Sequence, residues 1–443
     1  MIISKKFYEY NMRDDFSVPV YVGYDLIEIG KIKGINPQKR IAGQLIRENG
    51  QTYLELADFP SKKNMSSNPS RITYDFDDKV KNQDDGSTWY ASTWDGKMQF
   101  VIRKYFRVDF TTNIANNHFS GSTSKWLVSD YSIANQLMLS EKIESADLSL
   151  DHVYTWFNIF HPDQDWSKTQ SLILKDLSLK KHPFLLEIGA RGTKKHELHI
   201  FQKTAYMSIK IVFESPQTRD FSYQLAVIIR NFFQILIGKS IGINRIILNR
   251  NILLDTSNQN ITRDERENWF LDQSFLPNEV NETRTGFATS YDDISDEFNS
   301  ILKEYLNDLK LQRFVADFLI VDHFRTPVNT QIITLVSAVE SYYNEAKYIN
   351  GKNIQKAIYK LERLSKLVEK PNDFLKNGIH GNATDVNSLL QEMVDARDYI
   401  VHGVKSEKYT SEAELVPDLI IFKNIIREAI VRIISKQVKS NNE

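Results

Sequence analysis

An arginine and a histidine stand five residues apart near the end of a late amphipathic segment, at Arg397 and His402. A guanidinium can stabilise negative charge that develops in a transition state, and an imidazole can transfer a proton near neutral pH. Asp398 precedes His402 by four residues, the helical spacing at which a carboxylate can orient the ring and favour its protonated form. We therefore take these three residues as the candidate site.

One helix is expected to carry all three residues. It begins at Thr384 or Asp385 and ends near Gly403, a typical C-cap residue. Arg397 falls within the apolar stripe of this helix, so its charge needs a partner or a role. Five residues correspond to a rotation of about 140°, so Arg397 and His402 converge only near a frayed helix end or across an interface. The predicted stripe consists of Val386, Leu389, Leu390, Met393, Val394, Ile400 and Val401.

Two further residues are supporting candidates. Glu340, in a predicted helix over 328–348, could neutralise Arg397 or face the seam of the helical bundle, although an exposed glutamate is the commoner explanation. Tyr399 could stack on a base or line the site, although an aromatic residue at helical spacing more often packs in a core. Arg397 and His402 also have a structural alternative: a buried ion pair, and a positive charge that is favourable near a helix C-terminus.

The order of predicted elements indicates an α+β fold with a β-rich N-terminal domain followed by an all-α helical bundle. The N-terminal domain is expected over 1–285, with a hairpin at 41–59 that turns at Asn49-Gly50. A helix over 221–239 should pack on the sheet. The polar, acidic stretch around 286–300 is the predicted linker or docking segment, and the helical domain covers 301–443. Further strands are expected at 98–110, 185–188, 197–201, 208–213 and 244–254, and helices at 294–307, 311–324, 328–348, 354–369, 385–402 and 418–436.

Composition sets limits on location and partners. The 443 residues include 41% hydrophobic and 26% charged residues, as is ordinary for a globular protein. The absence of cysteine excludes disulfides, thiolate zinc sites and a cysteine nucleophile, and with no recognisable secretion signal it leads us to expect a cytoplasmic protein. The most apolar run, 225–238, is interrupted by Arg230 and Asn231, so no membrane span is expected. A net charge of −1 means that any nucleic acid must be bound by local basic patches.

Other motifs are weaker. No glycine-rich phosphate loop is present, and the aspartate pairs at 84–85 and 292–293 lie in turn or linker settings, so we expect neither a cofactor nor a catalytic metal. The histidines of 196–199 would lie on opposite faces of a strand. Basic residues around 180–195 could contact phosphates but more often keep a surface soluble. Arg191 and His196 have the same five-residue spacing as Arg397 and His402, but across an expected Gly-Thr turn between strands. The spacing alone is therefore weak, and the helical setting must support it.

Arg397-Asp398-x-x-x-His402, at the end of a helix in an all-helical C-terminal domain, resembles the signature of HEPN ribonucleases. The family pattern is an arginine, usually a polar residue, and a histidine after a short spacer; Asp398 stands where asparagine is more usual. The β-rich region ahead of such a domain resembles the ApeA-type HEPN proteins of bacterial anti-phage abortive infection.

This resemblance implies a metal-independent endoribonuclease, with transfer RNA among its candidate substrates. His402 would act as general acid or base, Arg397 would stabilise the transition state, and Asp398 would orient His402. The resemblance also implies a homodimer or higher homo-oligomer, a phage-derived trigger, and sensing by the N-terminal domain. The alternative is a catalytically silent nucleotide-binding or dimerisation module, with recognition by the N-terminal domain.

Overall fold

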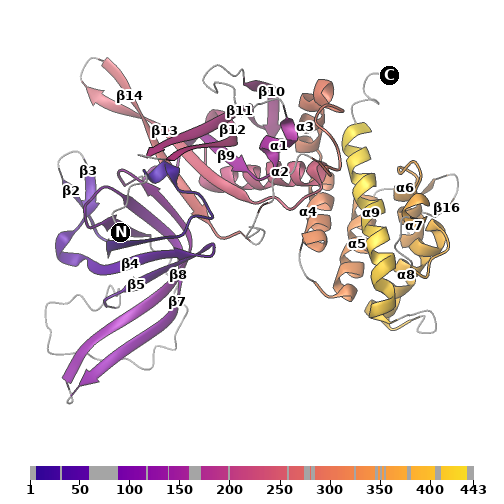
Figure 1. The fold of residues 1–443 in the computed structure, drawn as a ribbon, viewed down its shortest axis with the longest axis horizontal. Coiled ribbons are helices and arrows are strands. Elements are labelled where there is room, and N and C mark those ends of the chain that lie inside the picture. Colours follow the sequence, from indigo (N-terminus) through magenta and orange to yellow (C-terminus); the bar gives the residue numbers. More distant parts are fainter. Residues whose placement is uncertain are drawn as a thin grey trace.

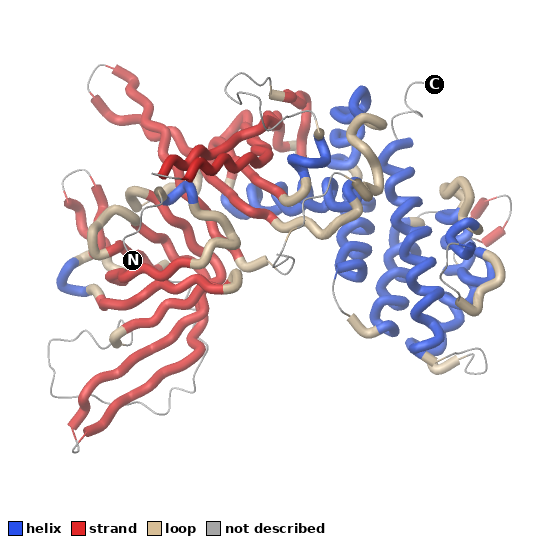
Figure 2. Tube along the Cα trace, in the orientation of Figure 1, coloured by secondary structure: helices blue, strands red, loops and turns tan. Residues whose placement is uncertain are grey.

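The computed structural model places a β-rich region at one end of an elongated molecule and helices at the other (Figures 1 and 2). The β-rich region comes first in the chain and the helices follow, so the predicted order of β-rich and helical parts is confirmed. The structure describes residues 6–436, apart from 30–31, 59–87, 116–117, 138, 159–170, 198–199, 257–258, 274–279, 281–284, 324–325, 345–347, 350–351, 354–355, 377–380 and 405–410.

Six antiparallel strands of the described chain form a closed ring in the order β8-β5-β4-β1-β6-β7, because β7 pairs back with β8. Val18, Val20 and Val22 are buried, alternate with exposed or half-buried residues, and face the interior of this barrel. The predicted hairpin is confirmed: Asn49 and Gly50 both have positive φ, as a two-residue turn requires. The strands are β1 (Phe16–Gly23), β4 (Ile41–Glu48), β5 (Gln51–Leu56), β6 (Trp89–Thr93), β7 (Gln99–Ala115) and β8 (His118–Ala134).

A second group of strands continues from the barrel through β14, which pairs with β8 at Asn268↔Ile133. The order is β10-β11-β12-β9-β13-β14, and neighbouring strands are antiparallel. The turn expected at Gly192-Thr193 is wrong, because both residues pair within the long β11–β12 ladder. The strands are β9 (Ile143–Leu150), β10 (Leu172–Leu179), β11 (His182–Glu197), β12 (Ile200–Gln217), β13 (Ile243–Thr256) and β14 (Gln259–Leu271); a separate hairpin joins β2 (Leu26–Ile29) and β3 (Ile32–Ile35).

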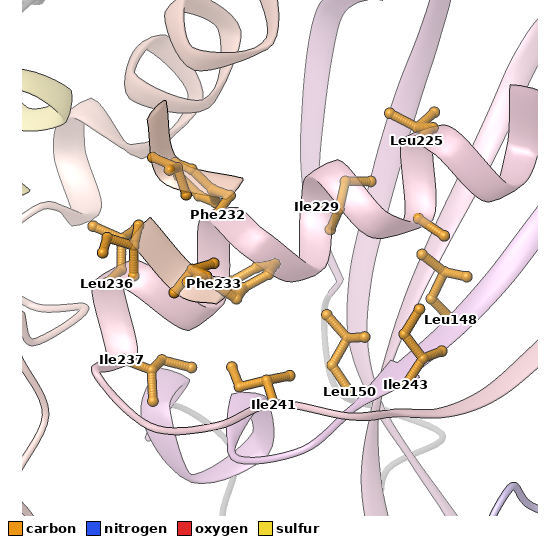
Figure 3. Close-up of a cluster of buried hydrophobic side chains, with 14 of the residues drawn as sticks. Leu148, Leu150, Leu225, Ile229, Phe232, Phe233, Leu236, Ile237, Ile241 and Ile243 are labelled. Atoms are coloured by element: carbon orange, nitrogen blue, oxygen red, sulfur yellow. The ribbon is translucent and has the colours of Figure 1, made fainter. Parts of the chain in front are cut away.

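Helix α2 (Arg219–Ile237) connects the sheet to the helical domain. It begins at the N-cap Thr218, whose hydroxyl accepts the Phe221 amide, and ends at Gly238 in the left-handed region. Its apolar face packs against β9 and the start of β13 (Figure 3), so the predicted helix on the sheet is confirmed. Each large apolar side chain buried here contributes roughly 1.5–3 kcal/mol. The fully buried residues include Leu225, Ile229, Phe232, Phe233, Leu236, Leu148 and Ile243.

The described part of the predicted linker is docked on this helix. The amides of Ala288 and Thr289 donate to the last carbonyls of α2, at 3.1 Å and 2.9 Å. Trp156, on the short helix α1 (Val153–Phe157), donates its indole N–H to the Thr289 carbonyl at 2.7 Å. The two amide bonds use carbonyls that the end of α2 would otherwise leave unsatisfied. The segment therefore joins the two parts of the molecule by specific contacts.

Among the remaining helices, α5 packs against α4, α6, α8 and α9. Within the described chain, none of the helices combines the length and hydropathy needed to cross a bilayer. The helices are α3 (Phe298–Asn307), α4 (Leu309–His323), α5 (Val328–Tyr342), α6 (Ala357–Ser365), α7 (Asp373–Lys376), α8 (Val386–His402) and α9 (Glu412–Lys436).

Several predicted helix boundaries are wrong, and the largest differences lie around α5 and α9. Helix α5 ends at Tyr342 and α6 begins only at Ala357, because a small hairpin, β15 (Tyr348–Ile349) with β16 (Lys352–Asn353), lies between them. The Asn350-Gly351 dipeptide is a sequence signal for such a hairpin. Helix α9 starts at Glu412, so Pro417 lies inside it instead of starting it. The first turn forms upstream because the Ser411 carbonyl accepts the amides of residues 414 and 415.

Candidate functional site

Both ends of α8 are fixed as the sequence predicts. The Asp385 carboxylate accepts the Ser388 amide at 2.9 Å, and the Ser388 hydroxyl accepts the Asp385 amide at 3.1 Å. This reciprocal capping box satisfies two amides that the helix leaves unpaired. At the other end Gly403 has a φ of 67°, and its amide donates to the Tyr399 carbonyl at 2.7 Å. The helix therefore presents its last turn in a defined orientation.

The buried face of α8 is shorter than predicted. The first five members of the predicted stripe are buried, and burial continues through Asp395 and Ala396. Ile400 is only half-buried and Val401 is 47% exposed, so the prediction for Val401 is wrong. Residues 397–400 are only partly buried and 401–402 are exposed, so the cover by neighbouring helices decreases after Ala396. The candidate residues lie at this transition from core to surface.

Arg397 is held by two carboxylates. Its Nη2 donates to Glu340 on α5 at 2.7 Å, and its Nη1 donates to Asp398 at 2.9 Å. The three side chains are each about one-fifth exposed, at 22%, 22% and 21%. Glu340 does pair with Arg397 in the structure, whereas its role as a supporting residue of a site stays a prediction. The guanidinium is therefore fixed between two helices while an edge of it stays accessible to water.

The sequence predicts that Asp398 orients His402, whereas in the structure the Asp398 carboxylate accepts a hydrogen bond from Arg397. A carboxylate that accepts a charged guanidinium has less capacity left for a second donor. The orienting role of Asp398 therefore stays a prediction. Tyr399, the next residue, is half-buried on α8, and its proposed stacking role also stays a prediction.

His402 is the last residue of α8 and is exposed. Within the described chain it shares neither a hydrogen bond nor an ion pair with Arg397, in agreement with the rotation of about 140° between them. Its neighbours Val401 and Val404 are each 47% exposed. A single chain thus presents the imidazole beside exposed apolar side chains, on a different side of the helix from the guanidinium.

Lys360 is a residue of the site that sequence reasoning missed. Its side chain lies in the buried face of α6, the residue is 6% exposed, and its Nζ donates to the backbone carbonyl of Glu340 at 3.1 Å. Glu340 lies in the last turn of α5, where carbonyl groups lack partners within the helix and favour a cation. A lysine among Ala357, Leu361 and Leu364, at helical spacing, was the signal available in the sequence. Lys360 positions the turn that carries Glu340.

Two acidic residues, Glu392 on α8 and Asp418 on α9, lie close to each other. Asp418 is fully buried, and its carboxylate accepts the amides of Asn382 at 2.8 Å and Ala383 at 3.4 Å. Burial and the nearby Asp418 carboxylate raise the pKa of Glu392, on α8, to about 7. A methyl group on Gly381 would overlap the Asp418 carboxylate, so this glycine permits the close approach. Asp418 thus joins the segment before α8 to α9.

Other sequence candidates are not part of this arrangement. Lys180 lies in the β10–β11 turn and donates to Gln224 on α2 at 3.0 Å. The side chains of 194–199 and the aspartates at 84–85 lie outside the described residues. No group of three or more histidine, aspartate or glutamate side chains that could hold a metal ion occurs in the described part of the chain.

Comparison of the chain with protein-family models, with curated proteins and with solved structures found no match. The interpretation of the site therefore depends on the residues and their contacts.

Proposed function

We propose that the protein is a metal-independent HEPN-type endoribonuclease that acts in anti-phage defence by abortive infection. The observation that supports this proposal best is the last turn of α8. It carries an exposed imidazole at His402, five residues after a guanidinium at Arg397 that is held in place yet partly accessible. Proton transfer and stabilisation of phosphorane charge are the two tasks that cleavage of RNA requires.

In the proposed reaction the 2′-hydroxyl of RNA is the nucleophile. An imidazole takes the proton from this hydroxyl, the 2′-oxygen forms a bond to phosphorus, and the bond from phosphorus to the 5′-oxygen breaks. The leaving 5′-oxygen takes up a proton, and the other product ends in a 2′,3′-cyclic phosphate. Arg397 stabilises the negative charge on the phosphorane-like transition state. His402 serves as the proton donor or acceptor.

We propose that two copies of the chain assemble the complete site. One chain supplies a single imidazole, and this imidazole is turned away from its own Arg397 by about 140°. A second copy would bring a second imidazole and cover the exposed Val401 and Val404, which are each 47% exposed. The N-terminal β-rich domain would sense the phage-derived trigger.

The two carboxylates on Arg397 fit an enzyme that is restrained at rest. Glu340 and Asp398 together neutralise the guanidinium, so an RNA phosphate must replace at least one of them. Breaking one bond of this partly exposed pair costs on the order of 1 kcal/mol, which binding of a phosphate can offset.

The same pairing is the observation that favours a second function. A guanidinium bound by two carboxylates is also what a structural ion pair between α5 and α8 would show. In that case the helical domain is a catalytically silent nucleotide-binding or dimerisation module, and recognition belongs to the N-terminal domain.

A cleavage assay separates the two functions. The purified chain is incubated with total RNA and with transfer RNA in EDTA, beside His402→Ala and Arg397→Ala. We expect cutting by the unchanged chain, products that end in a cyclic phosphate, and a rate about 10²–10⁴ times lower for His402→Ala. His182→Ala, at another exposed histidine on β11, is the matched control and should cut normally.

Equal cutting by His402→Ala would exclude the proposed reaction. If no variant cleaves RNA because the trigger is missing, the growth of cells that express each variant is measured instead. In that assay toxicity should depend on both His402 and Arg397. The mass in solution tests the assembly: a monomer at micromolar concentration, in an active preparation, would contradict the shared site.

A further inference from the structure

An exposed stack of aromatic rings stands on the outside of the barrel. Trp94 lies in the turn between β6 and β7 and is 59% exposed. Its ring stacks on Tyr21 of β1, with centroids 5.8 Å apart and an angle of 22° between the planes. The guanidinium carbon of Arg40, just before β4, lies 3.9 Å from the centre of the Tyr21 ring. We refer to Trp94, Tyr21 and Arg40 as the platform.

The backbone beneath the platform is well fixed. Tyr21 is paired on both sides, with Ser92 of β6 and with Ala42 of β4. The turn that carries Trp94 is closed by the Thr93 amide, which donates to the Met98 carbonyl at 2.9 Å, and Gly96 supplies the positive φ that the turn requires. The backbone on both sides of the stack is therefore fixed, and the Trp94 ring packs on Tyr21 although most of its surface is in water.

Arg40 differs from the other cations around the platform. Lys39 is paired with Asp25 at 2.5 Å, and Lys97 is paired with Asp95 at 3.2 Å. Arg40 has no carboxylate partner within the described chain, so its charge is available for an anion. The platform thus combines an open, flat aromatic face with an unmatched guanidinium.

We propose that the platform binds single-stranded nucleic acid: an unpaired base stacks on Trp94, and the adjoining phosphate contacts Arg40. Every base has a flat face that stacks on an aromatic ring, and such proteins combine stacking with cationic side chains along the backbone. Arginine also suits a phosphate because its planar fork donates two parallel hydrogen bonds. The features of the platform match both halves of a nucleotide.

The surroundings argue against a protein partner. Docking of a protein or an apolar peptide needs a contiguous apolar patch, whereas the residues that follow Trp94, at 95–97, are exposed and carry an acid, a glycine and a lysine. The barrel also lies at the opposite end of the molecule from α8 (Figure 1). The platform is therefore a separate site, and binding to it does not depend on the proposed cleavage reaction.

The test uses the full chain and a fluorescein-labelled single strand of twelve deoxythymidines, followed by fluorescence anisotropy at low salt. Deoxythymidine lacks the 2′-hydroxyl, so the strand cannot be cut by the proposed reaction and failure of that reaction does not affect the result. We expect Trp94→Ala to weaken binding about 5- to 100-fold, the usual effect of losing one stacked base, while Trp94→Phe retains most of the affinity. Phe106→Ala, at a 53% exposed aromatic residue of β7, is the matched control and should bind normally.

Two further readouts distinguish stacking from attraction by charge. Binding should quench tryptophan fluorescence in the unchanged chain and much less in Trp94→Phe. Arg40→Gln should weaken binding and reduce the slope of log affinity against log salt by about 0.7, the value for one phosphate contact on a single strand. Equal binding by the unchanged chain and Trp94→Ala, equal competition by an abasic strand or by duplex DNA, or no binding of the single strand would each overturn the proposal.

Discussion

Two clusters of charge in this protein have opposite composition. In the β-rich region one carboxylate, Glu267 on β14, is surrounded by the guanidinium groups of Arg219, Arg250 and Arg103, at 2.6, 2.8 and 3.6 Å. In the helical region one guanidinium, Arg397, lies between the two carboxylates Glu340 and Asp398. The first cluster is closed to water, since Glu267 is fully buried. The second opens at the end of a helix.

The difference in burial decides what each cluster can do. Burial alone would raise the pKa of Glu267, but the three arginines outweigh it and hold the pKa at about 2. That carboxylate is charged at every physiological pH and joins β14, β13, β7 and α2. The side chain of Arg397 is 22% exposed, so a ligand can replace one of its partners without burying a bare charge. A closed cluster fixes the fold, whereas an open one can take part in binding.

Glu267→Gln provides the most severe test of this contrast. It removes the anion that the buried Arg219 and Arg250 share, while Arg103 keeps Asp130 at 3.3 Å. We expect a loss of about 3–5 kcal/mol in the free energy of unfolding, measured by chemical denaturation. Glu55→Gln is the control, because Glu55 pairs with Lys125 on the surface with both side chains more than 40% exposed. That change should cost less than about 1 kcal/mol. Similar losses for the two variants would mean that burial does not separate the clusters.

Lys360→Met removes the hydrogen bond from Lys360 to the Glu340 carbonyl, which supports the cluster around Arg397. The substitution keeps most of the side-chain volume but leaves the Glu340 carbonyl without its buried donor, so we expect a loss of about 1–3 kcal/mol in stability. If Lys360 positions Glu340 and Arg397, cleavage should fall mainly through kcat, and Lys360→Arg should restore part of the rate. A loss of stability with unchanged kcat would show that Lys360 serves the fold alone.

Glu340→Gln tests whether Glu340 keeps Arg397 from binding RNA or only joins α5 to α8 as a structural ion pair. Arg397 keeps Asp398 as a partner and stays partly in water, so the free energy of unfolding should fall by about 1 kcal/mol or less. With one carboxylate removed, the guanidinium is more available to phosphate, so KM for RNA should decrease. Glu369→Gln is the control, because Glu369 is a 72% exposed partner of Arg432 on α9 and does not contact Arg397. Weaker RNA binding by Glu340→Gln would indicate that Glu340 holds Arg397 in its productive position.

The sequence predicted the local signals well and the distant contacts poorly. Asp385 and Gly403 mark the ends of α8, and Asn49-Gly50 marks the β4–β5 turn, because caps and turns depend on a few neighbouring residues. The pairing of Glu340 with Arg397 was weighed only as one possibility, since it joins residues 57 positions apart. Closure of the barrel by β7 and β8 and the donation from Lys360 to α5 depend on tertiary packing, which periodicity does not specify. Val401 was misassigned because a stripe gives the direction of a side chain but not where the neighbouring helix ends.

Glu392→Gln is the smallest expected effect and extends the comparison to a third cluster, in which two carboxyl groups meet. The folded-state pKa of Glu392 is raised from 4.5 to about 7 by burial and by Asp418, so the native state keeps a proton that the unfolded chain loses. Its contribution to stability is complete below about pH 4.5 and is lost as the pH rises to about 7. Thermal unfolding of Glu392→Gln should therefore show a flatter decline of Tm across this window than the unchanged chain, because glutamine resembles the protonated acid at every pH. Glu55→Gln should leave the decline as it is, and an identical slope for Glu392→Gln would show that the proton on this pair is not linked to folding.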